Sequence, residues 1–284
     1  MSETIKDKIL QSVEKMPSLP LTALKVLRLA NNLNSPPQEM LETIRVDPVI
    51  TAKVLKMINS SYFGLGSTVT DLRQALVMLG MNTIKNLALT SALLATMKRK
   101  KCSTLDLDGL WLHSLATAVS SKIIASEAGL PLMSHDEYFI IGLLHNIGKI
   151  FIFQFLEDEY SDVLESAKTK GLSLSESEND ILSMTSAEIG GLLARKWQLP
   201  DNITSGILYN QNFSEAKDFS KMCAIIKIAS YISTLKEIGW SDGLLLGSPG
   251  EDAYTLVGVT FEELEAPMIG LPEQIENAKS FIQE

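Results

Sequence analysis

Residue types that define several protein classes are scarce in this sequence of 284 residues. Its two cysteines, Cys102 and Cys223, lie far apart and form no CxxC pair. They support neither a disulfide framework nor a zinc cluster, and nothing around them marks an activated thiolate. Aromatic residues make up 6% of the chain, there are only 10 prolines, and leucine is abundant. This balance favours packed helices over sheets.

Positive charge is also scarce, because 34 acidic residues outnumber 25 basic ones and give a net charge of −9. Nucleic-acid binding needs a concentration of lysine and arginine, so the balance argues against such a partner. The single basic run, residues 98–101, is expected to be a solvated helix end. No signal peptide is recognisable, and polar residues interrupt the most apolar stretch, residues 139–155. We therefore expect a cytoplasmic protein without a membrane span.

Amphipathic helical patterns follow one another along the chain, and the alternating runs typical of strands are missing. Capping signals predict several helix ends. Asp47 precedes Pro48, a residue favoured at the first helical position, and Thr185 with Glu188 forms a capping-box pattern. Gly80 suits the position that follows a helix. The sequence therefore predicts an all-α protein.

The polar stretch 98–108 is the best candidate boundary between two helical subdomains. We expect an N-terminal helical subdomain of about six helices over residues 1–103, and a second helical subdomain over residues 104–284. In the second, we expect helices at 110–128 and 137–145, a turn at 146–149, and further helices from 150, at 158–170, 185–197 and 221–237, with two weaker helices near the C-terminus.

Several short motifs, in a fixed order, carry a specific resemblance. Residues 142–149, G-L-L-H-N-I-G-K, look like the G-L-L-H-D-I-G-K signature of the HD superfamily of metal-dependent phosphohydrolases. The wider pattern resembles the HDOD family, a degenerate branch of that superfamily found in bacterial signalling proteins, over about residues 16–235. The resemblance implies an N-terminal helical subdomain packed on a degenerate HD-like subdomain. The other motifs lie at 16–20, 47–48, 59–64, 75–80, 110–114 and 197–200.

In active members of the HD superfamily, two histidines and two aspartates hold a divalent metal that activates water for attack on a phosphoester. The resemblance places His113 and His145 at the two histidine positions. The aspartate position adjacent to His145 is Asn146, and the distant one is placed at Ser230, so both carboxylates are replaced. Amide and hydroxyl groups are weak ligands for a transition metal. The extra histidine positions of some relatives fall at about Ser186 and at Asn210–Gln211.

Structural roles remain open for the same residues. His113 could be a core histidine, and His145 could cap its helix, with Asn146 and Gly148 adopting the special backbone conformations of a turn. Lys149 could satisfy C-terminal carbonyl groups of the preceding helix.

We expect no catalytic metal and no other cofactor, since two imidazoles without a carboxylate make a poor catalytic site. His113 and His145 are weak candidates for a divalent transition metal, and a carboxylate such as Glu188 or Asp201 could compensate for the missing ligands. The third histidine, His135, is expected in the loop before the motif and is not a candidate ligand.

The leading hypothesis is a non-catalytic signalling module that binds other signalling proteins and has no small-molecule substrate. The alternative is a metal-dependent phosphohydrolase with an unusual ligand set, acting on nucleotides or cyclic dinucleotides. The loops 59–64 and 240–246 place aromatic or apolar residues beside glycine and serine, so they are candidate partner contacts. Packing of these loops onto the helices is the alternative.

Overall fold

The computed structural model describes residues 4–30, 36–97, 105–132, 135–240 and 247–282, and within these ranges every regular element is helical. The basic run 98–101, Cys102 and loop residues 241–246 lie outside the described ranges. The predicted all-α fold is confirmed. The α-helices are α1 (Ile5–Lys15), α2 (Leu21–Ala30), α3 (Pro37–Arg45), α4 (Pro48–Ile58), α5 (Leu72–Thr96), α6 (Leu107–Glu127), α7 (His135–Leu144), α8 (Ile147–Phe155), α9 (Glu157–Lys170), α10 (Leu174–Leu182), α11 (Ser186–Lys196), α12 (Asp201–Leu208), α13 (Ser220–Leu235), α14 (Glu251–Val257), α15 (Phe261–Glu265) and α16 (Leu271–Ala278).

Side-chain caps determine where several helices begin, as the sequence predicts. The Asp47 carboxylate accepts from the backbone N–H groups of Val49 and Ile50 at the start of α4. A reciprocal capping box joins Thr185 and Glu188 at the start of α11. Each contact satisfies backbone donors that have no partner inside the helix.

Gly80 interrupts α5, where its φ of +79° departs from helical geometry. The interruption divides α5 into two segments, which gives six helical segments among the described residues before residue 98. Only glycine adopts such a φ without strain, which explains why a short helix ends here and a longer one follows.

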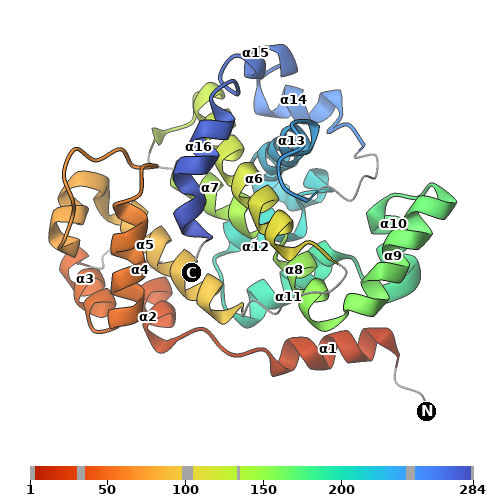
Figure 1. Cartoon of the computed structure of the whole chain (residues 1–284), viewed down its shortest axis with the longest axis horizontal. Coiled ribbons are helices and arrows are strands. Elements are labelled where there is room, and N and C mark those ends of the chain that lie inside the picture. The colour runs from red at the N-terminus through yellow and green to blue at the C-terminus, as the bar shows by residue number, and fades with distance from the viewer. Residues whose placement is uncertain (1–3, 31–35, 98–104, 133–134, 241–246, 283–284) are drawn as a thin grey trace.

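The core of the second half is built around α6, which packs against α7 and α13. Helix α8 packs on α11, and α9 pairs with α10. In Figure 1 the helices α2 to α5 lie to one side of α6, and α9 with α10 lies at the opposite side. This arrangement places the end of α7 and the start of α8 beside α6, at the middle of the molecule.

The helix α1 packs on the second half of the chain. It lies along the lower edge of the view in Figure 1 and contacts α11. Lys196 donates to the Glu14 carbonyl oxygen at 2.7 Å, and the indole of Trp197 donates to the Pro17 carbonyl oxygen at 3.0 Å. Residues 5–17 are therefore attached to helices that follow the polar stretch 98–108.

The end of the chain also crosses the expected division. Helix α16 packs on α6, and the 3₁₀ helix Lys279–Phe281 that follows contacts α4. Phe281 is buried in an aromatic cluster, with ring centroids 5.5 Å from Tyr62 and 5.1 Å from Phe139. The C-terminal segment therefore joins the two halves of the fold.

Two local expectations are wrong. His135 is not in a loop: it is the buried first residue of α7, where Asp136 and Glu137 fit the acidic preference of a first turn, and its ring donates to the Leu130 carbonyl oxygen. The predicted turn at 146–149 is shorter, because α8 begins at Ile147 and includes Gly148.

Two stretches, Leu72–Thr96 and His135–Phe155, are long and apolar enough to span a membrane by length and composition alone. The first is interrupted at Gly80, and the second consists of two helices separated at residues 145–146. More than half of the first and most of the second are buried inside the protein. Both stretches therefore have the character of core helices.

Candidate functional site: a buried histidine pair

The structure brings together the two histidines of the sequence motifs. His113 lies on α6 and His145 follows the last residue of α7, and their ring centroids are 5.8 Å apart. Both side chains are buried. Ser230 on α13 is also buried and reaches His113, so three different helical regions contribute to this cluster.

Close glycine contacts bring the backbone to these positions. Gly148 on α8 lies against α11, and an added Cβ would meet the Ser186 carbonyl oxygen at 1.9 Å and the Gly190 nitrogen at 2.5 Å. This close approach, rather than a turn conformation, explains the glycine of the motif, because Gly148 has no positive φ. Asn146, with φ −98° and ψ 15°, lies in the turn between α7 and α8, so the interpretation as a turn residue fits Asn146 but not Gly148.

A second glycine brings a loop over His113. Gly239 has a φ of +78°, and a Cβ there would lie 2.4 Å from the Gly109 carbonyl oxygen and the His113 nitrogen. The next residue, Trp240, donates its backbone N–H to the Gly109 carbonyl oxygen at 2.8 Å. The loop therefore closes directly over the α6 turn that carries His113, which excludes water from the ring.

The tautomer of His145 follows from its contact. Its Nδ1 lies 2.6 Å from the Gly142 carbonyl oxygen, which can only accept a hydrogen bond. Nδ1 therefore carries a proton, and in the neutral ring Nε2 carries a lone pair. That Nε2 is buried and has no hydrogen-bond partner among the described residues. The contact also caps the end of α7, as one interpretation of the sequence predicts.

His113 is contacted by hydroxyl groups. Its Nε2 lies 3.2 Å from Ser230 Oγ and 3.5 Å from Thr117 Oγ1. The Thr117 hydroxyl also donates to the His113 carbonyl oxygen at 3.0 Å. A neutral hydroxyl therefore stands against His113 at the position where the family resemblance places a carboxylate.

Burial keeps both histidines uncharged. It lowers the pKa of His113 to about 3 and the pKa of His145 to about 4. The positive charge of Lys149 lowers the pKa of both rings further, and the Ile238 and Gly142 backbones each offset a part of the shift. Near neutral pH the site is therefore a pair of neutral imidazoles beside a cation.

Lys149 does not contact the last carbonyl groups of α7. Its ammonium group lies 5.6 Å from the ring centroid of Trp240, in a cation–π arrangement. Trp240 in turn packs edge-on against Phe153, with ring centroids 5.1 Å apart. The lysine of the motif is thus held against the loop that covers His113.

Glu178 is a buried carboxylate that the sequence analysis did not identify. It is 1% exposed, accepts from the Ser186 backbone N–H at 2.7 Å, and receives the Tyr160 hydroxyl at 3.2 Å. Burial raises its pKa, and the charge of Lys149 partly offsets that shift. Its position on the apolar face of α10, four residues after Leu174 and four before Leu182, is a signal that could have revealed its burial.

The remaining predicted positions are distributed around the cluster. Ser186, which stands at an extra histidine position of some relatives, is the first residue of α11, and its backbone N–H donates to the Glu178 carboxylate. Asn210 is buried at the end of α12 and donates to the His145 carbonyl oxygen at 3.5 Å. Glu188 is exposed in its capping box, and Asp201 is exposed at the start of α12.

The donor set does not fit the divalent metal that the HD superfamily holds. Within the described ranges, no group of three or more histidine, cysteine, aspartate or glutamate side chains is close enough together to bind a metal ion. Glu178 is already engaged by Ser186 and Tyr160, and the charge of Lys149 repels a cation. Two neutral imidazoles offset none of the charge of a dication.

Three residues outside the cluster, Cys223, Tyr62 and Phe63, make packing or hydrogen-bond contacts that indicate structural roles. The Cys223 thiol donates to the Ser205 carbonyl oxygen at 3.4 Å, and burial raises its pKa to about 12, so it is no reactive thiolate. Tyr62 and Phe63, from a loop predicted to contact partners, pack against Phe281. These contacts favour the alternative in which that loop packs onto the helices.

Comparison with known proteins identifies the family. The HDOD domain model matches residues 16–213, and the chain belongs to the HDOD family. An uncharacterized protein of Treponema pallidum (strain Nichols) is 23% identical over 214 residues, which cover 74% of this chain and 40% of that protein. The chain thus spans about two fifths of the length of this curated relative.

Solved structures share the fold. An HDOD domain protein with unknown function from Geobacter sulfurreducens has a TM-score of 0.80 and 22% identity, over 98% of this chain and 97% of its own. A "Putative phosphohydrolase" from Shewanella amazonensis SB2B has a TM-score of 0.74 and 25% identity, over 97% and 98%. A "Putative signal transduction protein" from Marinobacter aquaeolei VT8 has a TM-score of 0.76 and 21% identity, over 98% and 66%.

Proposed function

We propose that this HDOD protein is a non-catalytic signalling module that acts by binding other proteins of a signalling pathway in the cytoplasm. The observation that carries the proposal is the contact between Ser230 and Nε2 of His113. It fills the site with a neutral hydroxyl where hydrolysis requires a carboxylate ligand, so the fold retains the shape of an HD site without its charge.

The electrostatics support the same conclusion. Metal-assisted hydrolysis requires the cation to be fixed and its water acidified. Here both histidines are neutral, Asn146 replaces the adjacent carboxylate, and Lys149 adds positive charge. The loop at Gly239 also brings its backbone against the α6 turn that carries His113, and the His113 side chain is buried.

A metal-dependent phosphohydrolase remains the second candidate, and one observation favours it. The lone pair on Nε2 of His145 is buried without a partner in the described structure, which is the state of a histidine ready to bind a metal. The name of the Shewanella relative is consistent with such an activity.

One experiment separates the two candidates. The protein is purified without added metal, its manganese, iron and zinc are measured, and hydrolysis of bis(p-nitrophenyl) phosphate and a cyclic dinucleotide is followed with and without Mn²⁺. We expect less than stoichiometric metal and the same residual rate for the wild type and for His145→Gln. Stoichiometric metal, with turnover that His145→Gln abolishes, contradicts the proposal.

A genetic comparison tests the signalling role directly. Deletion of the gene is complemented with the wild type, with His145→Gln and with His113→Gln, after circular dichroism has shown that the variants are folded. A non-catalytic module predicts that the folded variants restore the phenotype as well as the wild type does. Failure of both folded variants favours the enzyme.

A further inference from the structure

The C-terminal segment, residues 271–282, packs on the rest of the protein as an amphipathic helix does. It consists of α16, which contacts α6, and of the 3₁₀ helix that follows, which contacts α4. Side chains between its buried positions, such as Glu273 and Glu276, are exposed. The buried side chains recur at intervals of four, three and three residues: Leu271, Ile275, Ala278 and Phe281. A helix that binds in an apolar groove of a partner protein has anchors at this spacing.

Phe281 is the aromatic anchor of this segment. It is 3% exposed, and its ring centroid lies 5.1 Å from that of Phe139 on α7. The ring centroids of Tyr62 and Phe63 lie 5.5 Å and 6.2 Å from it. Both belong to the loop 59–64, whose apolar and aromatic residues predict contacts with partners. The C-terminal segment therefore covers the aromatic side chains of that loop.

The C-terminal segment is attached through apolar contacts. Within the described part of the chain, no hydrogen bond or ion pair joins residues 271–282 to any residue before Met268. The ion pair of Lys279 with Glu276 is internal to the segment. Apolar burial is not directional, so another helix with the same spacing of apolar side chains can replace this one.

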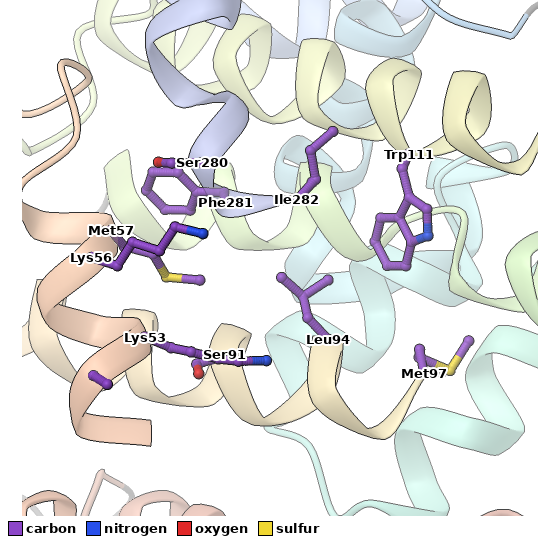
Figure 2. A pocket seen from close by; sticks show the side chains of 11 residues that line it. Lys53, Lys56, Met57, Ser91, Leu94, Met97, Trp111, Ser280, Phe281 and Ile282 are labelled. Atoms are coloured by element: carbon purple, nitrogen blue, oxygen red, sulfur yellow. The ribbon is translucent and has the colours of Figure 1, made fainter. Parts of the chain in front are cut away.

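The C-terminal segment leaves space beneath it. A pocket of about 200 Å³ lies between the end of the segment and α5. Figure 2 shows Phe281 and Ile282 on one side of this pocket and Leu94 on the other, with Trp111 and Met97 at the end away from Phe281. A helix that carries a further large apolar side chain after its aromatic anchor would fill this pocket and gain contacts that the segment does not make.

We propose that the surface beneath the C-terminal segment binds partner proteins, and that the segment is its built-in competitor. The partner presents an amphipathic helix with aliphatic residues at i and i+4, a small residue at i+7, an aromatic residue at i+10 and a large apolar residue beyond it. This helix displaces the segment and packs against Tyr62 and Phe139. The inference rests on the proposed function, because it names the surface and the kind of partner through which the module acts.

Competition within one chain makes partner binding conditional. The segment is tethered to its own site, so its effective concentration there is high. Only molecules from which the segment has separated can bind a partner, and the apparent affinity is reduced by that fraction. A change that loosens the segment therefore strengthens partner binding without altering the surface itself.

A fluorescent peptide with the sequence of residues 268–284 is the probe, and anisotropy follows its binding to the full-length protein. Phe281→Ala in the protein weakens the competitor, so we expect this variant to bind the peptide at least tenfold more tightly than the wild type does. Phe261→Ala is the matched control. It removes an exposed phenylalanine of α15 that contacts Tyr254, and it is expected to bind as weakly as the wild type.

Changes in the peptide test the anchor. With the Phe281→Ala protein as receptor, the peptide that carries Phe281→Ala is expected to bind at least tenfold more weakly than the unaltered peptide, because it lacks the aromatic anchor. The peptide that carries Glu273→Gln, on the exposed face of α16, is expected to bind within twofold of the unaltered one.

Hydrogen exchange tests separation of the segment in the wild type, without any substitution. We expect the amide groups of α16 to exchange through an opening at least tenfold more frequent than the opening of α6. Denaturant should promote this opening, because separation exposes apolar surface, whereas fraying of a helix end exposes little.

Three results overturn the inference. The first is equal peptide binding, or none, by the wild type and the two protein variants, when thermal melting shows that they are folded. The second is equal binding of the unaltered and the Phe281→Ala peptides. The third is an opening of α16 as rare as that of α6, and this result decides alone if Phe281→Ala does not fold. Metal-dependent turnover would refute the proposed function and leave these binding results unchanged, so the two failures are distinguishable.

Discussion

Ser230 Oγ lies 3.2 Å from Nε2 of His113, so helices α13 and α6 are joined at the middle of the molecule by a contact between two neutral groups. The same pair of helices packs along much of its length. The contact thus joins the two helices through side chains of the protein itself. The effect of the two missing carboxylate charges can therefore be tested by restoring them through mutation.

Restoring the two carboxylates should restore metal affinity. The double variant Asn146→Asp/Ser230→Asp is expected to bind Mn²⁺ at least tenfold more tightly than the wild type, because carboxylates suit such a cation and offset its charge. Without metal it is expected to be less stable, since Ser230 is buried. Calorimetric titration with Mn²⁺ and thermal melting measure the two effects. Asn179→Asp, on the exposed face of α10, is the control, and equal affinities in all three proteins would show that the ligand positions are misplaced.

Stability should fall as the pH is lowered from 7 to 5. The folded-state pKa values of His113 and His145, about 3 and about 4, lie below the ordinary value of about 6.5. In this range the unfolded chain binds more protons than the native state, so each histidine loses about 2 kcal/mol of stabilisation. Urea unfolding at several pH values measures the slope.

The variant His113→Gln isolates this contribution. Its free energy of unfolding is expected to fall about 2 kcal/mol less between pH 7 and 5 than that of the wild type. Glu178 acts in the opposite sense, because its raised pKa favours proton uptake by the native state, but it is the same in both proteins. Ser230→Ala keeps both histidines and should keep the wild-type slope. Parallel curves for the wild type and His113→Gln would refute the assignment.

The crossing of α8 and α11 should tolerate no side chain at Gly148. Gly148→Ala is expected to destabilise the protein by about 3 kcal/mol or more, because the new Cβ would meet backbone atoms that cannot move aside. Gly66→Ala is the matched control, since no atom lies within 4 Å of its Cβ position. Urea unfolding measures the free energy of unfolding of both variants. An unchanged value for Gly148→Ala would mean that α8 and α11 move apart easily.

The attachment of α1 should depend in part on the indole of Trp197. Trp197→Phe keeps an aromatic ring but removes the hydrogen bond to the Pro17 carbonyl oxygen and part of the buried ring, which is expected to lower stability by more than about 1 kcal/mol. Limited proteolysis should then cut between α1 and α2 sooner than in the wild type. The control is Trp240→Phe, in the loop that covers His113, which should leave the rate of that cut unchanged.

Local chemistry explains which features of the fold could be predicted from the sequence. The start of α4 at Asp47, the break at Gly80 and the capping box at Thr185 each depend on a few neighbouring residues. The position of α1 on α11 depends on Trp197 meeting Pro17, a contact between distant parts of the chain. No periodicity of α1 indicates which apolar surface it covers, so its placement required the structure.

In the candidate site too, contacts between distant parts of the chain could not be predicted from the sequence. The order of motifs placed Ser230 at an aspartate position of the family, and in the structure Ser230 lies beside His113. Gly148 was interpreted as a turn residue, because a sequence does not show that another helix passes within van der Waals distance. Glu178 was missed, since a carboxylate on an apolar face has a partner only once Ser186 has folded against it.

The aromatic cluster of Tyr62, Phe139 and Phe281 has a consequence for how the protein is made. Synthesis proceeds at about 5–20 residues per second, so roughly 10–40 s separate the appearance of Tyr62 from that of Phe281. During this interval the nascent chain lacks the 3₁₀ helix Lys279–Phe281, whose Phe281 later packs on the other two rings. The N-terminal helices can therefore complete this packing only after Phe281 has been synthesised, and a ribosome that stalls before residue 281 leaves the aromatic rings open to chaperones.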